Sequence, residues 1–161
     1  MPFNNICIIE YKVRYLAQNL VILHRKLKKD MNRNTPISYV MTKNIVVADL
    51  HTKFDNILTL FLDYGIYHLP VTYDDKLIGI LSMTDALKFY RSGASADNFN
   101  IEEIMTRNPK SLNPDDTLGD AVDILSEAKF RSLPVVDDEG KIVGIVSNKD
   151  MVRILDKVLE D

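Results

Sequence analysis

Two pairs of side chains in this sequence place a hydroxyl three residues before a carboxylate. Ser82 precedes Asp85, and Ser147 precedes Asp150. This spacing is typical of a helix N-terminus, where the hydroxyl accepts a hydrogen bond from a backbone N–H and the carboxylate lies at the positive end of the helix dipole. The residues alone therefore favour two helix caps, with binding of ligand hydroxyls as the alternative.

Motifs that carry catalysis are missing from the sequence. It has no glycine-rich phosphate loop, no G-x-G-x-x-G, no H-E-x-x-H and no G-x-S-x-G. Its single cysteine, Cys7, has no evident histidine partner and excludes an internal disulfide and a cysteine-based zinc site. The acidic runs 74–75 and 137–139 are expected to be solvated turns. We expect a non-enzymatic protein without a metal or cofactor, located in the cytoplasm.

Charge and hydropathy exclude two kinds of partner. Residues 1–35 hold seven basic and two acidic side chains, a net +5, whereas residues 36–161 hold 13 basic and 21 acidic ones, a net −8. An acidic main body argues against nucleic acid, which usually requires a basic face. No apolar run approaches the ~20 residues that cross a bilayer, so we expect no membrane span.

The chain contains an internal repeat. Four short blocks recur in the same order, at an offset of 64 residues and then, after one inserted turn residue, of 65. They are Met41-Thr42 and Met105-Thr106, Leu69-Pro70-Val71 and Leu133-Pro134-Val135, Gly79-Ile80 and Gly144-Ile145, and Ser82-x-x-Asp85 and Ser147-x-x-Asp150. Because insertions are tolerated at hairpin tips, the extra residue within 137–140 supports a hairpin there.

Each repeat reads as strand, helix, strand, strand, helix. The expected elements are 45–48, 53–64, 69–72, 77–81 and 83–91 in the first repeat, and 110–112, 117–128, 132–136, 141–146 and 147–158 in the second. We place repeat 1 at 36–91, a linker at 92–100 and repeat 2 at 101–161. A three-stranded unit of this size leaves one sheet face uncovered, so we predict an α/β (α+β) fold in which the two repeats pack as a pseudo-twofold pair.

These motifs resemble those of CBS domains, and the tandem resembles a Bateman module, over roughly residues 37–161. The shared features are Met-Thr, Leu-Pro-Val and Gly-Ile-x-Ser-x-x-Asp. The resemblance implies a regulatory sensor that binds AMP, ADP or ATP in the cleft between its repeats and works as a homodimer on an unknown protein partner. S-adenosylmethionine is a less favoured ligand.

The resemblance also implies roles for individual residues. Asp150 would accept hydrogen bonds from the ribose diol beside Ser147, since a carboxylate accepts from two adjacent hydroxyls. The remaining positions in the second repeat are Ser111 and Asn108 near the adenine, and Arg131 and Lys149 near phosphate. The first repeat keeps Ser82 and Asp85 and offers His68 to a phosphate, but it has Val47, Tyr67 and Thr84 at three other motif positions. We therefore predict one principal site, at the motifs of the second repeat.

Two other functions compete with this one. One is a ligandless structural or dimerisation module whose Ser-x-x-Asp motifs only cap helices. The other is a regulatory protein related to the CBS insert of inosine-monophosphate dehydrogenase, binding another adenosyl ligand such as S-adenosylmethionine.

The segment 1–35 lies outside the resemblance and has a pattern of its own. Seven apolar residues alternate at spacings of three and four: Ile6, Ile9, Val13, Leu16, Leu20, Leu23 and Leu27. This stripe predicts an amphipathic helix over about 5–29 that serves dimerisation or packs against a neighbouring module. A membrane-surface helix, or a physiological start at Met31, are the alternatives.

Overall fold

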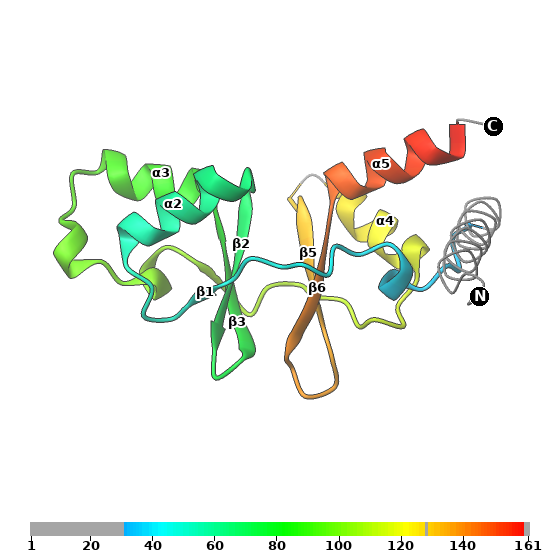
Figure 1. Cartoon of the computed structure of the whole chain (residues 1–161), viewed down its shortest axis with the longest axis horizontal. Coiled ribbons are helices and arrows are strands. Elements are labelled where there is room, and N and C mark those ends of the chain that lie inside the picture. The colour runs from blue at the N-terminus through cyan, green and yellow to red at the C-terminus, as the bar shows by residue number, and fades with distance from the viewer. Residues whose placement is uncertain (1–30, 128, 160–161) are drawn as a thin grey trace, which may run out of the picture.

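The structure is a computed structural model of the chain, and it describes residues 31–127 and 129–159 (Figure 1). It contains two sheets, each flanked by two helices, and so confirms the mixed α/β class predicted from the sequence. The helix expected over 5–29 lies outside the described residues.

The first unit is a four-stranded sheet in the order β1-β2-β3-β4. Its strands are β1 (Ala48–Asp49), β2 (His68–Tyr73), β3 (Lys76–Ser82) and β4 (Thr106–Arg107). The helices α2 (Phe54–Tyr64) and α3 (Met83–Arg91) pack against it. The core is aliphatic and aromatic, with Ile57, Phe61, Leu69 and Leu81 almost entirely shielded from solvent.

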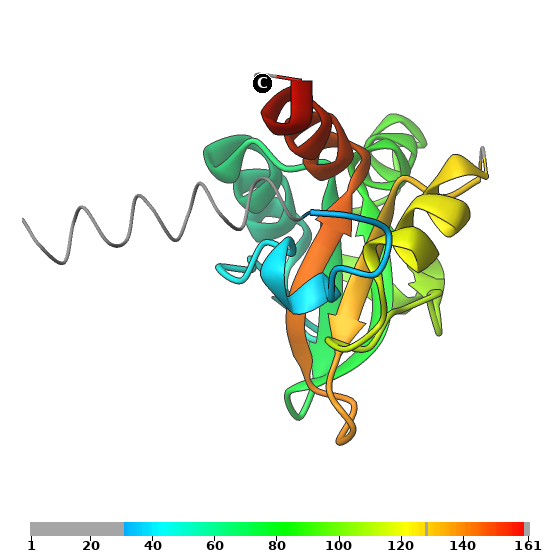
Figure 2. The same ribbon diagram turned by 90° about the vertical axis from the view of Figure 1, so that its right-hand side faces the viewer.

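The second unit repeats this arrangement with fewer strands. The antiparallel pair β5 (Ser132–Val136) and β6 (Ile142–Ser147) is covered by α4 (Leu118–Ser126) and α5 (Asn148–Leu159). A capping box begins α4, with the Thr117 hydroxyl accepting from the backbone N–H of Asp120 and the Asp120 carboxylate accepting from that of Thr117. Figure 2 shows α4 and α5 against the same side of the β5–β6 pair.

Each unit is completed by a piece of chain that precedes the other repeat's strands. The 3-10 turn η1 (Ile37–Tyr39) contributes Ile37 to the core of the second unit, and η3 (Ile101–Glu103) contributes Ile101 to that of the first. The recurring motif residues contact each other where these segments pass from one repeat to the other unit. A Cβ built at Gly79 would overlap the Met105 sulfur, and one at Gly144 would overlap the Met41 sulfur. The recurring Met-Thr and Gly-Ile blocks are therefore two halves of one packing contact.

Two sequence expectations for short strands were wrong. The strand expected over 45–48 is only Ala48–Asp49, paired in parallel with β2. Residues 110–112 form no strand, although Leu112 makes a single bridge to Val135. The second repeat's leading strand is instead Thr106–Arg107, which pairs with β3 of the first unit. Pairing partners, which local sequence does not encode, decide where such short strands form.

The two hairpins meet at their tips. The backbone N–H of Leu77 donates to the carbonyl of Gly140 at 3.1 Å, and Lys76 bridges to Lys141. The Lys141 ammonium lies 3.0 Å from the Asp75 carboxylate. The units are thus joined by backbone pairing as well as by the exchanged segments. Within the described residues, no helix has the length and apolar character needed to cross a membrane.

Candidate functional site

The Ser82–Asp85 pair forms the N-terminal cap of α3. The Ser82 hydroxyl accepts from the backbone N–H of Asp85 at 3.2 Å and donates to the carboxylate at 2.5 Å. Lys88, one turn on, donates to the other carboxylate oxygen at 3.1 Å. Burial alone would raise the pKa of Asp85, but the hydrogen bonds from Ser82 and Lys88 and the Lys88 charge outweigh it and lower that pKa. The carboxylate is therefore ionised at neutral pH, and 32% of its side chain is exposed.

The equivalent Asp150 in α5 is more enclosed and has more partners. Its side chain is only 9% exposed. One carboxylate oxygen accepts from the backbone N–H and the hydroxyl of Ser147, at 2.8 and 2.6 Å. The other accepts from the Arg153 guanidinium at 2.8 Å and from the Thr42 hydroxyl at 3.3 Å. Since a carboxylate has about four acceptor positions, this set leaves Asp150 little free capacity.

Thr42 reaches Asp150 because of the exchanged segments. Its backbone pairs with Ile145 in β6, with both N–H···O distances at 3.0 Å, so a residue of the first repeat lies at the second repeat's motif. The corresponding Thr106 pairs with Ile80 in β3 and is exposed. Each Ser-x-x-Asp motif is therefore flanked by the Met-Thr block of the other repeat.

Charged groups of both repeats act on His68, the first residue of β2. His68 is half-buried at the start of β2, and burial lowers its pKa, as does the positive charge of Arg131 just before β5, while Asp85 acts in the opposite direction. A histidine, an arginine and a carboxylate from different repeats thus share one electrostatic neighbourhood. Next to Arg131, the Ser132 hydroxyl is buried and has no hydrogen-bond partner among the described residues.

The other predicted site residues divide between the units. The backbone N–H of Asn108 donates to the Ile78 carbonyl at 3.2 Å, so Asn108 lies against β3 in the first unit. Its positive φ of 46° is a conformation that asparagine tolerates. Ser111 precedes the bridge from Leu112 to β5, and Lys149 is exposed in the first turn of α5. Within the described residues, no hydrogen bond or ion pair joins Asn108 to Asp150, with which the sequence grouped it.

Two hollows open on the first unit, away from both Ser-x-x-Asp motifs. The smaller, of about 300 Å³, is lined by Tyr73, Ile78 and Asn108, among other residues. The larger, of about 470 Å³, lies between the 50–53 and 96–102 segments. Among the residues that the structure describes, no cluster of histidine, cysteine and acidic side chains is arranged to hold a metal ion.

Sequence reasoning missed two partners of the central carboxylates, Thr42 and Arg153. Thr42 belongs to the recurring Met-Thr block, but the repeat pattern does not show that this block crosses to the other unit. Arg153 occupies the position equivalent to Lys88, and a cation three residues after each aspartate was the available signal.

Known proteins share this arrangement. The family model described as "CBS domain" matches residues 37–92 and 101–157. A Methanocaldococcus jannaschii protein, MJ0188, is 33% identical over 119 residues, which are 73% of this chain and 43% of that protein. The chain spans half or less of the length of the curated relatives it matches.

Solved structures extend the likeness. The CBS domain pair of protein MJ0100, solved with 5′-methylthioadenosine and S-adenosyl-L-methionine, has a TM-score of 0.68 at 28% identity and covers 76% of this chain and 96% of its own. CBSX2 of Arabidopsis thaliana, solved with AMP, has a TM-score of 0.68 at 29% identity and covers 78% and 98%. By its matched repeats and its architecture, this chain belongs to the CBS domain family.

Proposed function

We propose that this protein is a non-enzymatic regulatory module that binds an adenine nucleotide in the cleft between its repeats. The proposal is supported by the electrostatic influence that Arg131 of the second repeat and Asp85 of the first both exert on His68, which indicates that charged groups of the two repeats lie within range of one another. An ionised carboxylate suits a ribose diol, and a guanidinium suits a phosphate. The adenosine-containing ligands in the MJ0100 and CBSX2 structures support the same ligand class.

Two of the remaining predicted residues would complete this site. Lys149 would add a second cation for a phosphate chain and Ser111 would lie beside the base, whereas Asn108, which lies against β3 in the first unit, is left out of this site. The unpartnered Ser132 hydroxyl favours a bound ligand or water, because a buried hydroxyl without a hydrogen bond costs about 1–3 kcal/mol. AMP, ADP and ATP are the proposed ligands, and S-adenosylmethionine is the alternative.

Two carboxylates compete for the ribose. The motif of the second repeat is the more complete in sequence, but Arg153 or Thr42 must release Asp150 before a diol binds there. Asp85 is more exposed and has fewer partners. Asp85→Ala and Asp150→Ala form a matched pair, and the variant that loses more affinity identifies the principal site.

Calorimetry and thermal shift with AMP, ADP, ATP and S-adenosylmethionine test the proposal. At ~100 times its dissociation constant, a ligand that binds only the folded state stabilises it by about 2.7 kcal/mol. We expect the alanine variant at the principal site to bind about 30-fold more weakly, which corresponds to ~2 kcal/mol of lost hydrogen bonding. Failure of all four ligands to bind the intact protein would contradict the proposal.

Signalling requires a second conformational state and a partner protein that detects the change. A nucleotide shifts an equilibrium only by its difference in affinity for the two states. Exposed apolar side chains occupy equivalent positions on α3 and α5, namely Leu87 and Tyr90, and Val152 and Leu155. Such paired surfaces support a homodimer built through the helices. Sedimentation of the intact protein with and without nucleotide measures the dimer, and we propose the cytoplasm as its location.

A ligandless structural module is the second candidate. It is favoured by the internal hydrogen bonds of both carboxylates, which serve as helix caps. If Asp150→Ala lowers the free energy of unfolding while nucleotide affinity stays unchanged, capping is its role.

A further inference from the structure

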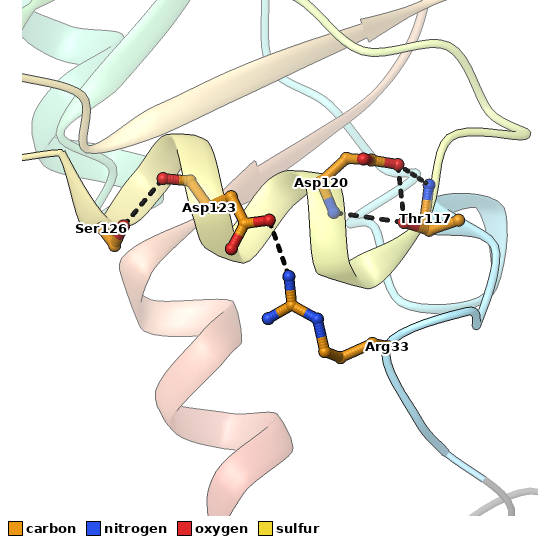
Figure 3. A network of polar contacts seen from close by, with 5 residues as sticks. All are labelled: Arg33, Thr117, Asp120, Asp123 and Ser126. Carbon is orange, nitrogen blue, oxygen red and sulfur yellow. Dashed lines mark hydrogen bonds and ion pairs between the residues drawn. The ribbon is translucent and has the colours of Figure 1, made fainter.

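The first described residues are clamped onto α4. The backbone carbonyls of Arg33 and Thr35 accept from the N–H groups of Gly119 and Leu118, at 2.8 and 2.7 Å, and so satisfy free donors at the helix N-terminus. The Arg33 guanidinium lies 2.6 Å from Asp123 on the exposed side of α4 (Figure 3). Met31 is half-buried against the core of the second unit. The preceding chain therefore leaves the body at the α4–α5 end of the molecule.

The pseudo-twofold relation shows what occupies the equivalent place in the first unit. There the linker before η3 lies over α2 and α3, and Phe99 packs against Phe54 and Phe89 at ring-centre distances of 5.0 Å. The equivalent position before η1 is Thr35, which supplies no comparable apolar surface. The second unit thus lacks, among its described residues, the aromatic cover that the first unit has.

The last turn of α5 shows the consequence. Met151 and Ile154 pack against the core of the second unit, and Val158 continues the same side of the helix. Val158 is nevertheless 45% exposed. Leu155 lies three residues before Val158 on the same helix, so this surface adjoins the proposed dimer surface, while Val152 lies farther round α5.

Charge indicates which segment covers this place. Exposed acidic side chains lie on α4, at Asp120 and Asp123, and directly after it, at Glu127, which is paired with Lys129. The chain just before Met31 is basic, with Arg25, Lys26, Lys28 and Lys29 on both sides of Leu27, the last residue of the apolar stripe. The Arg33–Asp123 ion pair has the same arrangement, with a basic residue from the start of the described chain against an acidic residue of α4.

We propose that the segment 16–29 of the same chain packs over α4 and α5, with its leucine stripe on Ile154 and Val158 and its basic residues beside the α4 carboxylates. The intramolecular arrangement is favoured because the segment is tethered at Met31 beside its docking surface, which gives an effective concentration in the millimolar range for a short connection. The surface formed by α4 and α5 is therefore the docking surface of the chain's own N-terminal segment.

Thiol reactivity in the full-length chain tests this arrangement. With Cys7→Ser as background, Val158→Cys introduces a single thiol whose reaction with 5,5′-dithiobis(2-nitrobenzoic acid) is timed. We expect it to react at least about tenfold more slowly than after the further changes Leu23→Asp and Leu27→Asp, which remove the apolar stripe. The control Gln18→Asp, off the stripe, should keep the thiol protected.

The same measurement identifies other occupants. Protection that is independent of protein concentration supports the tethered segment, whereas protection that grows with concentration assigns the surface to a second copy and overturns the proposal. A thiol that reacts equally fast with and without the leucines also overturns it. Circular dichroism of each variant confirms that the fold is retained, and an equivalent thiol from Val152→Cys reports the dimer surface separately.

Discussion

The two halves of this molecule carry the same motif in different surroundings. At the start of α3, Asp85 is held by Ser82 and Lys88 and remains 32% exposed. At the start of α5, Asp150 is held by Ser147, Arg153 and Thr42 and is 9% exposed. A shared motif therefore sets the position of a carboxylate, whereas its neighbours set how much of it a ligand can reach.

The cores differ in a similar way. Phe54, Phe89 and Phe99 form an aromatic cluster in the first unit, with ring centres 4.7–5.0 Å apart. The equivalent positions in the second unit are Leu118, Ile154 and Thr35. The first unit is covered by an aromatic side chain from the linker, whereas the second unit has Thr35 at the equivalent position, without an aromatic ring.

The largest effect is expected from removing the aromatic cluster. Phe54→Ala should lower the free energy of unfolding by about 3–5 kcal/mol, because it opens a cavity and loses two ring contacts. Leu118→Ala, at the equivalent position, should cost about 2–3 kcal/mol. Urea unfolding of both variants measures the difference, and equal losses would show that the aromatic contacts add nothing to the first unit.

A smaller effect should separate the two glycine contacts. A Cβ at Gly144 would lie 3.2 Å from the Cβ of Met41, close to the backbone, whereas at Gly79 the nearest atoms belong to the flexible end of Met105. Gly144→Ala should therefore destabilise by about 2–3 kcal/mol and Gly79→Ala by about 1–2 kcal/mol, the usual range for overpacking.

Combining each glycine substitution with a substitution of the methionine that it contacts tests whether the two residues form one packing contact between the repeats. If Gly144→Ala and Met41→Ala are coupled, the double variant loses less stability than the two single losses together. Simple additivity in chemical unfolding would mean that the recurring Met-Thr and Gly-Ile blocks are not one contact.

The sequence was sufficient for the fold class and for the order of the main elements. The repeated blocks located both hairpins, and the Ser-x-x-Asp spacing located the starts of α3 and α5, because these signals are local. It failed where the answer depends on a distant partner. The leading strand of the second repeat pairs through Thr106 and Arg107, not 110–112, since β3 offers the free edge there.

The site was predictable to the same degree. Local spacing indicated the carboxylates and their caps, and the charge of Arg131 acts on His68 from the other repeat. The hydrogen bond from Thr42 to Asp150 was not predicted, because it arises from the exchange of segments between the units, which no local sequence pattern indicates. Asn108 was grouped with Asp150 by motif order, but it lies along β3, the strand that leads to Asp85.

The smallest expected effect concerns pH and belongs to the first unit alone, since Ser132 replaces His68 in the second. Burial and the Arg131 charge hold the pKa of His68 below its ordinary 6.5, with Asp85 opposing them. Between the folded value and 6.5 the unfolded chain binds more protons, so this histidine makes stability fall as the pH drops below about 6.5 and contributes nothing above it.

Asp85 affects stability in a different pH range, because its lowered pKa gives stability that is lost only as the pH falls below its ordinary 3.8. Urea unfolding between pH 7.5 and 5.5 should therefore show a shallower loss of stability for His68→Asn than for the unchanged protein. A bound phosphate beside Arg131 would reverse the sign, because an anion favours the protonated imidazole, and the same titration with AMP present distinguishes the two states of the cleft.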